Sequence, residues 1–263
     1  MWKWESEGRA KAVVGIIHNA YEHHNRYAWV IQHLRNSQFT VITGDLPGHG
    51  KVGAVHDTLL DRYMRYVEQL VDVCKSQNLP YFLIAHGLGA LLLVRLLQKK
   101  DIECAGIVLT SPWLQLKHEP PKYSKVFASL QMNQIVDHEI TPPMLTRNEE
   151  RQREFAGDLT YATRVSHGWF RDVQLLMRAI VNEERKIVDV PAAVIVGEDD
   201  PIADPKVTRD WVYGQKLSES QFKKWPFMRH DILQEERRED AMIYVESFLD
   251  NVLRTNGYII GGD

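Results

Sequence analysis

The sequence has few cysteines and lacks any long apolar run. Its 263 residues include two cysteines, Cys74 and Cys104, which cannot form a disulfide framework and which we expect to be free thiols. No apolar stretch approaches the roughly 20 residues of a membrane-spanning helix. The first residues, MWKWESEGRAK, are charged and have no apolar signal-peptide core. We therefore expect no integral membrane segment and a cytoplasmic, reducing location.

An excess of charge of either sign is also missing. The chain has 32 basic and 35 acidic residues, a net charge of −3, and the two signs are well mixed. Nucleic acid and anionic membrane surfaces are therefore not expected as partners. The pair His23-His24 has no supporting carboxylate spacing, so we expect neither a metal nor a cofactor. Hydrophobic residues at 44% and charged residues at 25% are typical of a globular protein.

The chain alternates between short apolar runs and amphipathic stretches. Apolar strands separated by helices predict an α/β fold, with a mostly parallel central sheet and helices on both faces. The strands are expected at residues 13–17, 39–43, 81–84, 106–109, 192–196 and 221–225, and the helices at 27–35, 58–74, 88–98, 206–213 and 237–253.

The alternation stops between Trp113 and about residue 164. This stretch is too long for a plain loop and too apolar for a disordered linker. We predict a core formed by residues 1–112 and 165–263, with residues 113–164 inserted as a helical cap over the active site. Extra helices packed elsewhere on the sheet are the alternative.

Polar and small residues follow most of the expected strands. In parallel sheets the functional residues usually lie at these carboxyl ends of the strands. The stretch LIAHGLGALLL (residues 83–93) has the strand, sharp turn and helix of a nucleophile elbow, G-x-S-x-G. The position that would hold the attacking serine is Gly87. Later strands are followed by Gly197-Glu198-Asp199-Asp200 and by His230-Asp231. The order along the chain is therefore elbow, acid and histidine, as in the α/β-hydrolases.

Six segments in register make the chain similar to one known group. IIHNAYEHHNRY, GDLPGHG, LTSP, LTRNEE, VGEDDPIAD and the late histidine with its acidic neighbours resemble the bacterial lysophospholipase and monoacylglycerol lipase group of α/β-hydrolases, which is serine aminopeptidase S33-like. The resemblance runs from about residue 2 to residue 253. It implies hydrolysis of carboxylic esters of acylglycerols and lysophospholipids through a covalent acyl-enzyme.

The resemblance also implies roles for individual residues. His230 matches the general base, and Asp200 matches the acid that orients it, whereas Asp199 is expected to be a turn or capping residue. The backbone N–H groups of Ala20 and Leu88 match the oxyanion hole. Three further histidines beside the site are expected to be structural: His18, His49 and His86.

Three positions depart from the family pattern. Gly87 has no side chain and cannot attack a carbonyl, although glycine adopts the positive φ of an elbow without strain. Ala85 stands where a glycine is usual. Asn19 stands where a glycine of the oxyanion loop is usual. Asparagine tolerates positive φ, but the sequence does not predict whether the loop keeps the family geometry. Tyr21 and Asn25 stand where small residues are usual, and they are expected to narrow the pocket mouth.

Several hypotheses for function remain. The first is an ester hydrolase that is catalytically impaired because Gly87 replaces serine, whether naturally or by engineering. The second is a pseudoenzyme that binds a lipid-like or small apolar acyl ligand, with Trp113, Met132, Met144 and Leu145 as binding residues. A scaffold without ligand is a third hypothesis with less support. The sequence does not predict the oligomeric state.

Overall fold

The computed structural model of the protein describes residues 1–52, 54–119 and 133–258. A seven-stranded sheet has the order β1-β3-β2-β4-β5-β8-β9. The short β1 pairs antiparallel with β3, and every other pairing in this sheet is parallel. The strands are β1 (Trp2–Trp4), β2 (Ala12–Ile17), β3 (Phe39–Thr43), β4 (Tyr81–His86), β5 (Gly106–Thr110), β8 (Ala192–Gly197) and β9 (Ser220–Trp225).

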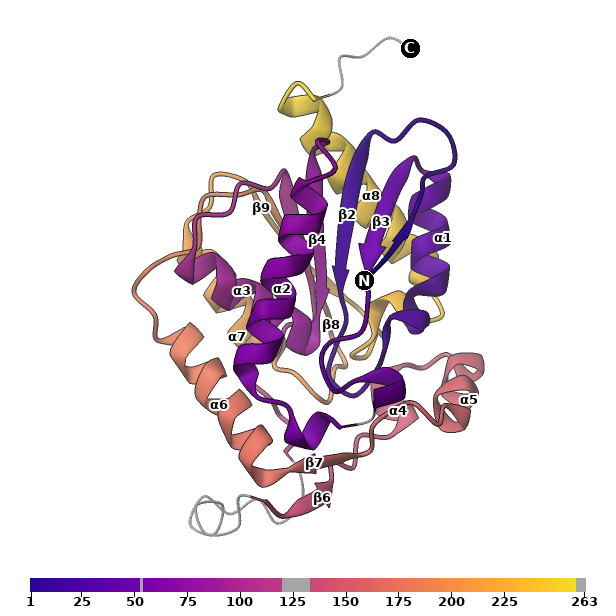
Figure 1. Ribbon diagram of the computed structural model, residues 1–263, viewed down its shortest axis with the longest axis vertical. Coiled ribbons are helices and arrows are strands. Elements are labelled where there is room, and N and C mark those ends of the chain that lie inside the picture. The colour runs from indigo at the N-terminus through magenta and orange to yellow at the C-terminus, as the bar shows by residue number, and fades with distance from the viewer. Residues whose placement is uncertain (53, 120–132, 259–263) are drawn as a thin grey trace.

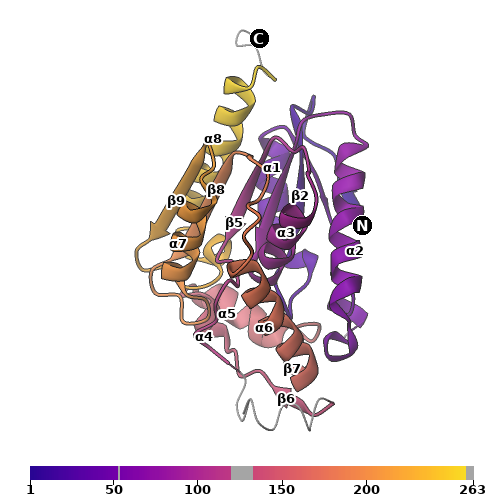
Figure 2. The same ribbon diagram turned by 90° about the vertical axis from the view of Figure 1, so that its left-hand side faces the viewer.

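Helices cover both faces of the sheet (Figures 1 and 2). Along β2 the side chains alternate, so that Val13 and Ile17 enter one core while Val14 and Ile16 enter the other. The first core is closed by α2 (Leu60–Lys75), α3 (Gly87–Lys99), α6 (His167–Val181) and α7 (Pro205–Gln215). The second is closed by α1 (Ala28–Asn36) and α8 (Arg238–Thr255). The expected α/β fold is confirmed.

The segment after β5 forms small elements at one end of the molecule, at the bottom of Figure 1. They are the antiparallel pair β6 (Ile135–Asp137) and β7 (Arg164–Ser166), with α4 (Pro142–Leu145) and α5 (Glu149–Gly157) between them. The division into a core and a cap remains a prediction. Four short 3₁₀ helices complete the described elements: η1 (His24–Tyr27), η2 (Gly50–Val52), η3 (Val55–Asp57) and η4 (Ile232–Gln234).

The elements that were not predicted from the sequence include β1 and α6. The strand β1 is a three-residue edge strand with two exposed side chains and one half-buried side chain, and it is too short to show an apolar pattern. The helix α6 does carry one, because Phe170, Val173, Met177 and Ile180 are buried at helical spacing. Among the described helices, none is both long enough and apolar enough to cross a bilayer.

The start of α3 lies against the end of β2. A Cβ atom at Gly89 would lie 2.5 Å from the carbonyl oxygens of both Ile17 and His18. These atoms belong to the backbone and cannot move aside as a flexible side chain could. Glycine at this position therefore allows α3 and the loop after β2 to approach closely.

We expect the substitution Gly89→Ala to lower the free energy of unfolding by about 3 kcal/mol, because the methyl group overlaps backbone oxygens. Urea unfolding followed by circular dichroism measures this loss. The control is Gly214→Ala on α7, where no described atom lies within 4 Å of the new Cβ. That variant should be unchanged or slightly more stable. Equal losses in the two variants would contradict the explanation.

Candidate active site

Asp200 is buried at the carboxyl edge of the sheet, shortly after β8. Its Oδ1 atom accepts hydrogen bonds from the backbone N–H groups of Ile202 (2.8 Å) and Ala203 (3.0 Å). Its Oδ2 atom lies 2.8 Å from Nδ1 of His230. The neighbouring Asp199 is exposed and forms an ion pair with Arg147. The structure thus brings Asp200, and not Asp199, against the histidine.

His230 lies between β9 and η4, and its exposed fraction is 0%. Because Nδ1 faces the Asp200 carboxylate, Nδ1 carries the proton and Nε2 is left as an acceptor. The indole N–H of Trp113 and the side-chain amide of Asn19 both donate to Nε2, each at 3.1 Å. The nitrogen that would accept a proton from a nucleophile is therefore already engaged by two N–H donors.

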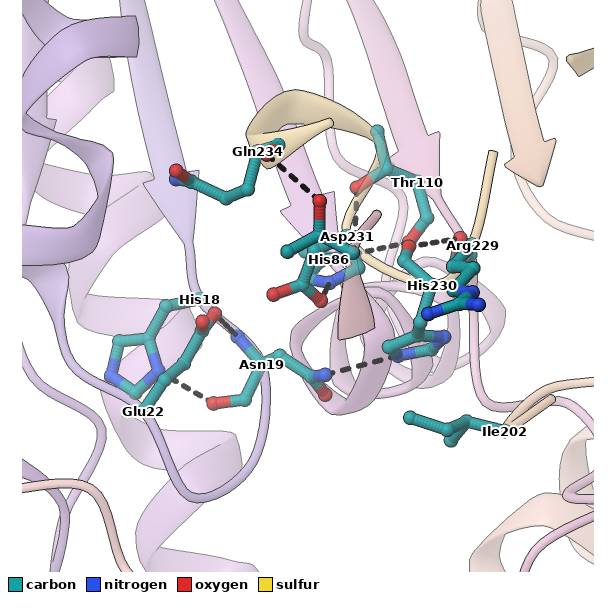
Figure 3. A network of polar contacts seen from close by, with 12 residues as sticks. His18, Asn19, Glu22, His86, Thr110, Ile202, Arg229, His230, Asp231 and Gln234 are labelled. Atoms are coloured by element: carbon teal, nitrogen blue, oxygen red, sulfur yellow. Dashed lines mark hydrogen bonds and ion pairs between the residues drawn. The ribbon is translucent and has the colours of Figure 1, made fainter. Parts of the chain in front are cut away.

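Gly87 stands at the junction of β4 and α3, where the nucleophile was expected. It has a φ of +51°, the left-handed conformation of an elbow, and it is buried. A Cβ built there would lie 1.9 Å from Oδ1 and 2.2 Å from Cγ of Asn19. The side chain of Asn19, which points toward His230 in Figure 3, thus occupies the space for a side chain at residue 87.

The two oxyanion-hole donors predicted from the sequence converge on one atom. The backbone N–H groups of Ala20 and Leu88 lie 2.7 Å and 2.8 Å from Oδ1 of Asn19 and donate to it. The donors are therefore in place, but their acceptor is a side chain of the chain itself. Asn19 is not among the non-glycine residues with positive φ, whereas Tyr21, two residues later, has a φ of +71°. The unusual backbone conformation of this loop lies at Tyr21.

A second histidine–carboxylate pair lies directly behind the first. Nε2 of His86 is 2.9 Å from Oδ1 of Asp231, and the ring centroids of His86 and His230 are 4.9 Å apart. Burial alone would lower the pKa of His86, but the hydrogen bond and the charge of Asp231 raise it to about 8. His86 is thus held by Asp231 at Nε2 and by Thr110 at Nδ1. Asp231 follows His230 directly in the sequence, but its pairing with His86 was not predicted.

His18 and His49 have structural surroundings, as the sequence analysis expected. Nδ1 of His18 donates to the backbone oxygen of Asn19 (2.6 Å), and its Nε2 accepts from the N–H of Leu46 (2.8 Å). Burial and the neighbouring His49 lower the pKa of His18 to about 3, and burial lowers that of His49 to about 4. His18 is therefore a neutral support for the loop that carries Asn19.

Metal binding has little support in the described part of the chain. His23 and His24 bond to different carboxylates, those of Asp158 and Asp45. Within that part, one group has the spacing of a metal site, namely His86, His230 and Asp231. A cation there would have to break the His86–Asp231 pair and the N–H contacts to His230.

The predicted ligand-binding residues lie at different places. Trp113 is buried and bonds to His230. Leu145 is buried, and its backbone oxygen accepts from the N–H of Asp231 (2.8 Å). Met144 is half-buried and packs against the first core. Met132 lies outside the described residues, and ligand contact by these residues remains a prediction.

Comparison with known proteins identifies the family of the chain. The family model described as serine aminopeptidase, S33, matches residues 8–237. The chain belongs to the serine aminopeptidase S33 family. Phospholipase YtpA of Bacillus subtilis (strain 168) is 30% identical over 261 residues, which are 96% of this chain and 100% of that protein. The Homo sapiens monoglyceride lipase is 27% identical over 216 residues, covering 77% of this chain and 70% of that protein.

A solved structure gives the same fold. The monoacylglycerol lipase of Paleococcus ferrophilus superimposes with a TM-score of 0.81 at 22% identity, covering 95% of this chain and 98% of that one. The S33 family chain therefore has the α/β-hydrolase fold that its motifs predict.

The buried His86–Asp231 pair should make stability depend on pH. A folded-state pKa of about 8 lies above the ordinary 6.5, so the contribution of His86 is complete below pH 6.5 and is lost as the pH rises through 8. The difference corresponds to about 2 kcal/mol of unfolding free energy. Urea unfolding between pH 6 and 9 measures it.

The matched variants are Asp231→Asn, which removes the charge facing His86, and Asp199→Asn, which removes an exposed one. Asp231→Asn should flatten the decrease between pH 6.5 and 8, whereas Asp199→Asn should leave it intact. An unchanged pH profile in Asp231→Asn would show that another group causes the decrease.

Proposed function

We propose that this S33 family member is a non-hydrolytic relative of the lipid-ester hydrolases. It has an acid, a base and oxyanion donors, but it does not cleave acyl esters by the family mechanism. The observation that carries this proposal is Gly87 at the elbow. Loss of the serine in a serine hydrolase lowers kcat by about 10⁶-fold, since acid and base then have nothing to activate.

The surroundings of His230 support the proposal, because no replacement nucleophile among the described residues touches its basic nitrogen. Both groups that bond to Nε2, from Asn19 and Trp113, are N–H donors. Ser111 lies close by, but its hydroxyl donates to the backbone oxygen of His230 (2.7 Å). A hydroxyl placed in this way cannot pass its proton to the imidazole.

The ligand class follows from the relatives. One is named a phospholipase and another a monoglyceride lipase, so both names indicate acyl esters with a polar head group. We propose that compounds of this class are ligands of the present chain and not substrates.

A cavity supports binding as the second candidate function. About 310 Å³ in volume, it lies between the segment after Trp113 and the C-terminal half of α6. This size is at the lower end of small-molecule sites. Its lining combines apolar and polar side chains, as an amphipathic molecule requires: Leu114, Gln115, Leu116, Glu119, Gln174, Met177, Arg178, Val181 and Asn182. Of the four ligand residues predicted from the sequence, Trp113, Met144 and Leu145 do not line it.

We expect the purified chain to hydrolyse p-nitrophenyl butyrate and a monoacylglycerol no faster than its His230→Ala variant. Released p-nitrophenolate and free fatty acid measure the two reactions. Equal rates would show that His230 has no nucleophile to deprotonate. A rate at least about 100-fold above that of His230→Ala would overturn the proposed function.

Binding in the cavity is tested with two tryptophan substitutions on α6. Val181→Trp fills the cavity, whereas Leu175→Trp adds the same side chain at an exposed position outside it. We expect Val181→Trp to raise the Kd for a monoacylglycerol by at least about tenfold in native mass spectrometry, with Leu175→Trp unchanged. An equal Kd in both variants would contradict binding at this cavity.

A further inference from the structure

The side chain of Asn19 connects the oxyanion donors to the catalytic base. Its Oδ1 atom accepts from the N–H groups of Ala20 and Leu88. Its Nδ2 atom donates to Nε2 of His230, as the dashed line between these two residues in Figure 3 marks. An acyl substrate would present a carbonyl oxygen to the same donors during hydrolysis. The carboxamide therefore occupies the position that the reacting group of an ester would take.

The orientation of this carboxamide is determined by its partners. Two backbone N–H donors require an oxygen, and the acceptor nitrogen of His230 requires an N–H group. Turning the amide over would place its NH₂ group against two donors and its oxygen against a ring nitrogen that has no proton. The hydrogen bonds thus allow one orientation.

The backbone and surroundings of Asn19 hold it in this place. Its N–H donates to Oε1 of Glu22 (2.7 Å), and its carbonyl oxygen accepts from His18 (2.6 Å). Tyr21 is buried in the same loop, with its ring centroid 5.9 Å from that of Trp113. The exposed fraction of Asn19 itself is 4%, so little solvent competes for its hydrogen bonds.

Asn19 in this rotamer and a side chain at residue 87 exclude each other. The 1.9 Å between the built Cβ of residue 87 and Oδ1 of Asn19 is far below any non-bonded contact. A serine at residue 87 would therefore have to displace the carboxamide from the oxyanion hole. The two positions are coupled, although they lie 68 residues apart in the chain.

We propose that Asn19 is an internal occupant of the oxyanion hole, which blocks the catalytic centre independently of the missing serine. The inference rests on the proposed function, because it makes Asn19 a second cause, besides Gly87, of the loss of ester hydrolysis. A serine at residue 87 does not restore the centre while Asn19 remains. Removal of both features opens the hole and leaves the indole N–H of Trp113 as the remaining described donor to Nε2 of His230.

The test uses four proteins: the unchanged chain, Asn19→Gly, Gly87→Ser and the double variant. Each is treated with a p-nitrophenyl alkylphosphonate, and intact mass is followed over time. In a competent centre the serine oxygen attacks phosphorus, p-nitrophenolate leaves and His230 takes the proton, so the adduct forms on residue 87. We expect the double variant to react at least about 100-fold faster than Gly87→Ser, the size of effect that an oxyanion hole has.

A matched control is Gly87→Ser combined with Asn78→Gly, which removes an exposed asparagine with positive φ from the turn after α2. It should react no faster than Gly87→Ser alone. Asn19→Ala with Gly87→Ser provides a second double variant if the glycine loosens the loop. Failure of both folded Asn19 double variants to react faster than Gly87→Ser overturns the inference.

Two other outcomes separate the inference from the proposed function. If Gly87→Ser alone reacts as fast as the double variant, the inference falls while the proposed function stands. If the unchanged chain hydrolyses esters through His230, the proposed function falls by its own assay.

Thermal unfolding gives a second measurement that does not need catalysis. Gly87→Ser should lower the Tm by about 5 °C in the presence of Asn19, because the new side chain displaces the carboxamide. The decrease should be clearly smaller when Asn19→Gly is already present, since the strain of serine at positive φ is common to both backgrounds and cancels. Equal decreases in both backgrounds would show that the two residues are not coupled.

Discussion

The two backbone N–H groups that converge beside Gly87 are the constraint on which the rest of the site depends. Ala20 and Leu88 belong to the loop after β2 and to the start of α3, and both of their N–H groups are buried. A buried N–H without an acceptor costs about 1–3 kcal/mol, so an acceptor is required whether or not the chain is an enzyme. Asn19 supplies it from within the chain.

This arrangement removes the backbone strain and the unpaired polar groups by which a catalytic centre lowers the stability of a fold. Glycine at residue 87 adopts a φ of +51° without the strain of about 1–3 kcal/mol that a serine would have there. The oxyanion donors are paired, and the basic nitrogen of His230 accepts two N–H groups. A centre in which every group is satisfied gains stability at the expense of reactivity. Gly87 and Asn19 therefore act together: Gly87 avoids backbone strain, and Asn19 pairs the buried N–H groups.

The sequence predicted the sheet and the elbow, because these depend on local patterns and on the order of segments along the chain. The pairing of Asp200 with His230 was implied by the resemblance to the α/β-hydrolases. The role of Asn19 was not predictable in the same way. Its substitution for glycine was visible, but its function depends on one side-chain rotamer and on a contact with residue 87 across the fold. The pairing of His86 with Asp231 was not predicted either, because it too is a contact between residues far apart in the chain.

An acid and a base at the expected places do not by themselves indicate turnover. Asp200 orders its own loop through the N–H groups of Ile202 and Ala203, and it also holds His230. His230 in turn accepts from Trp113 and Asn19, and its backbone oxygen accepts from Ser111. The pair thus connects segments that follow β2, β5, β8 and β9, which is a structural task. Because buried polar networks are costly to leave partly satisfied, these contacts explain the presence of both residues without any catalytic role.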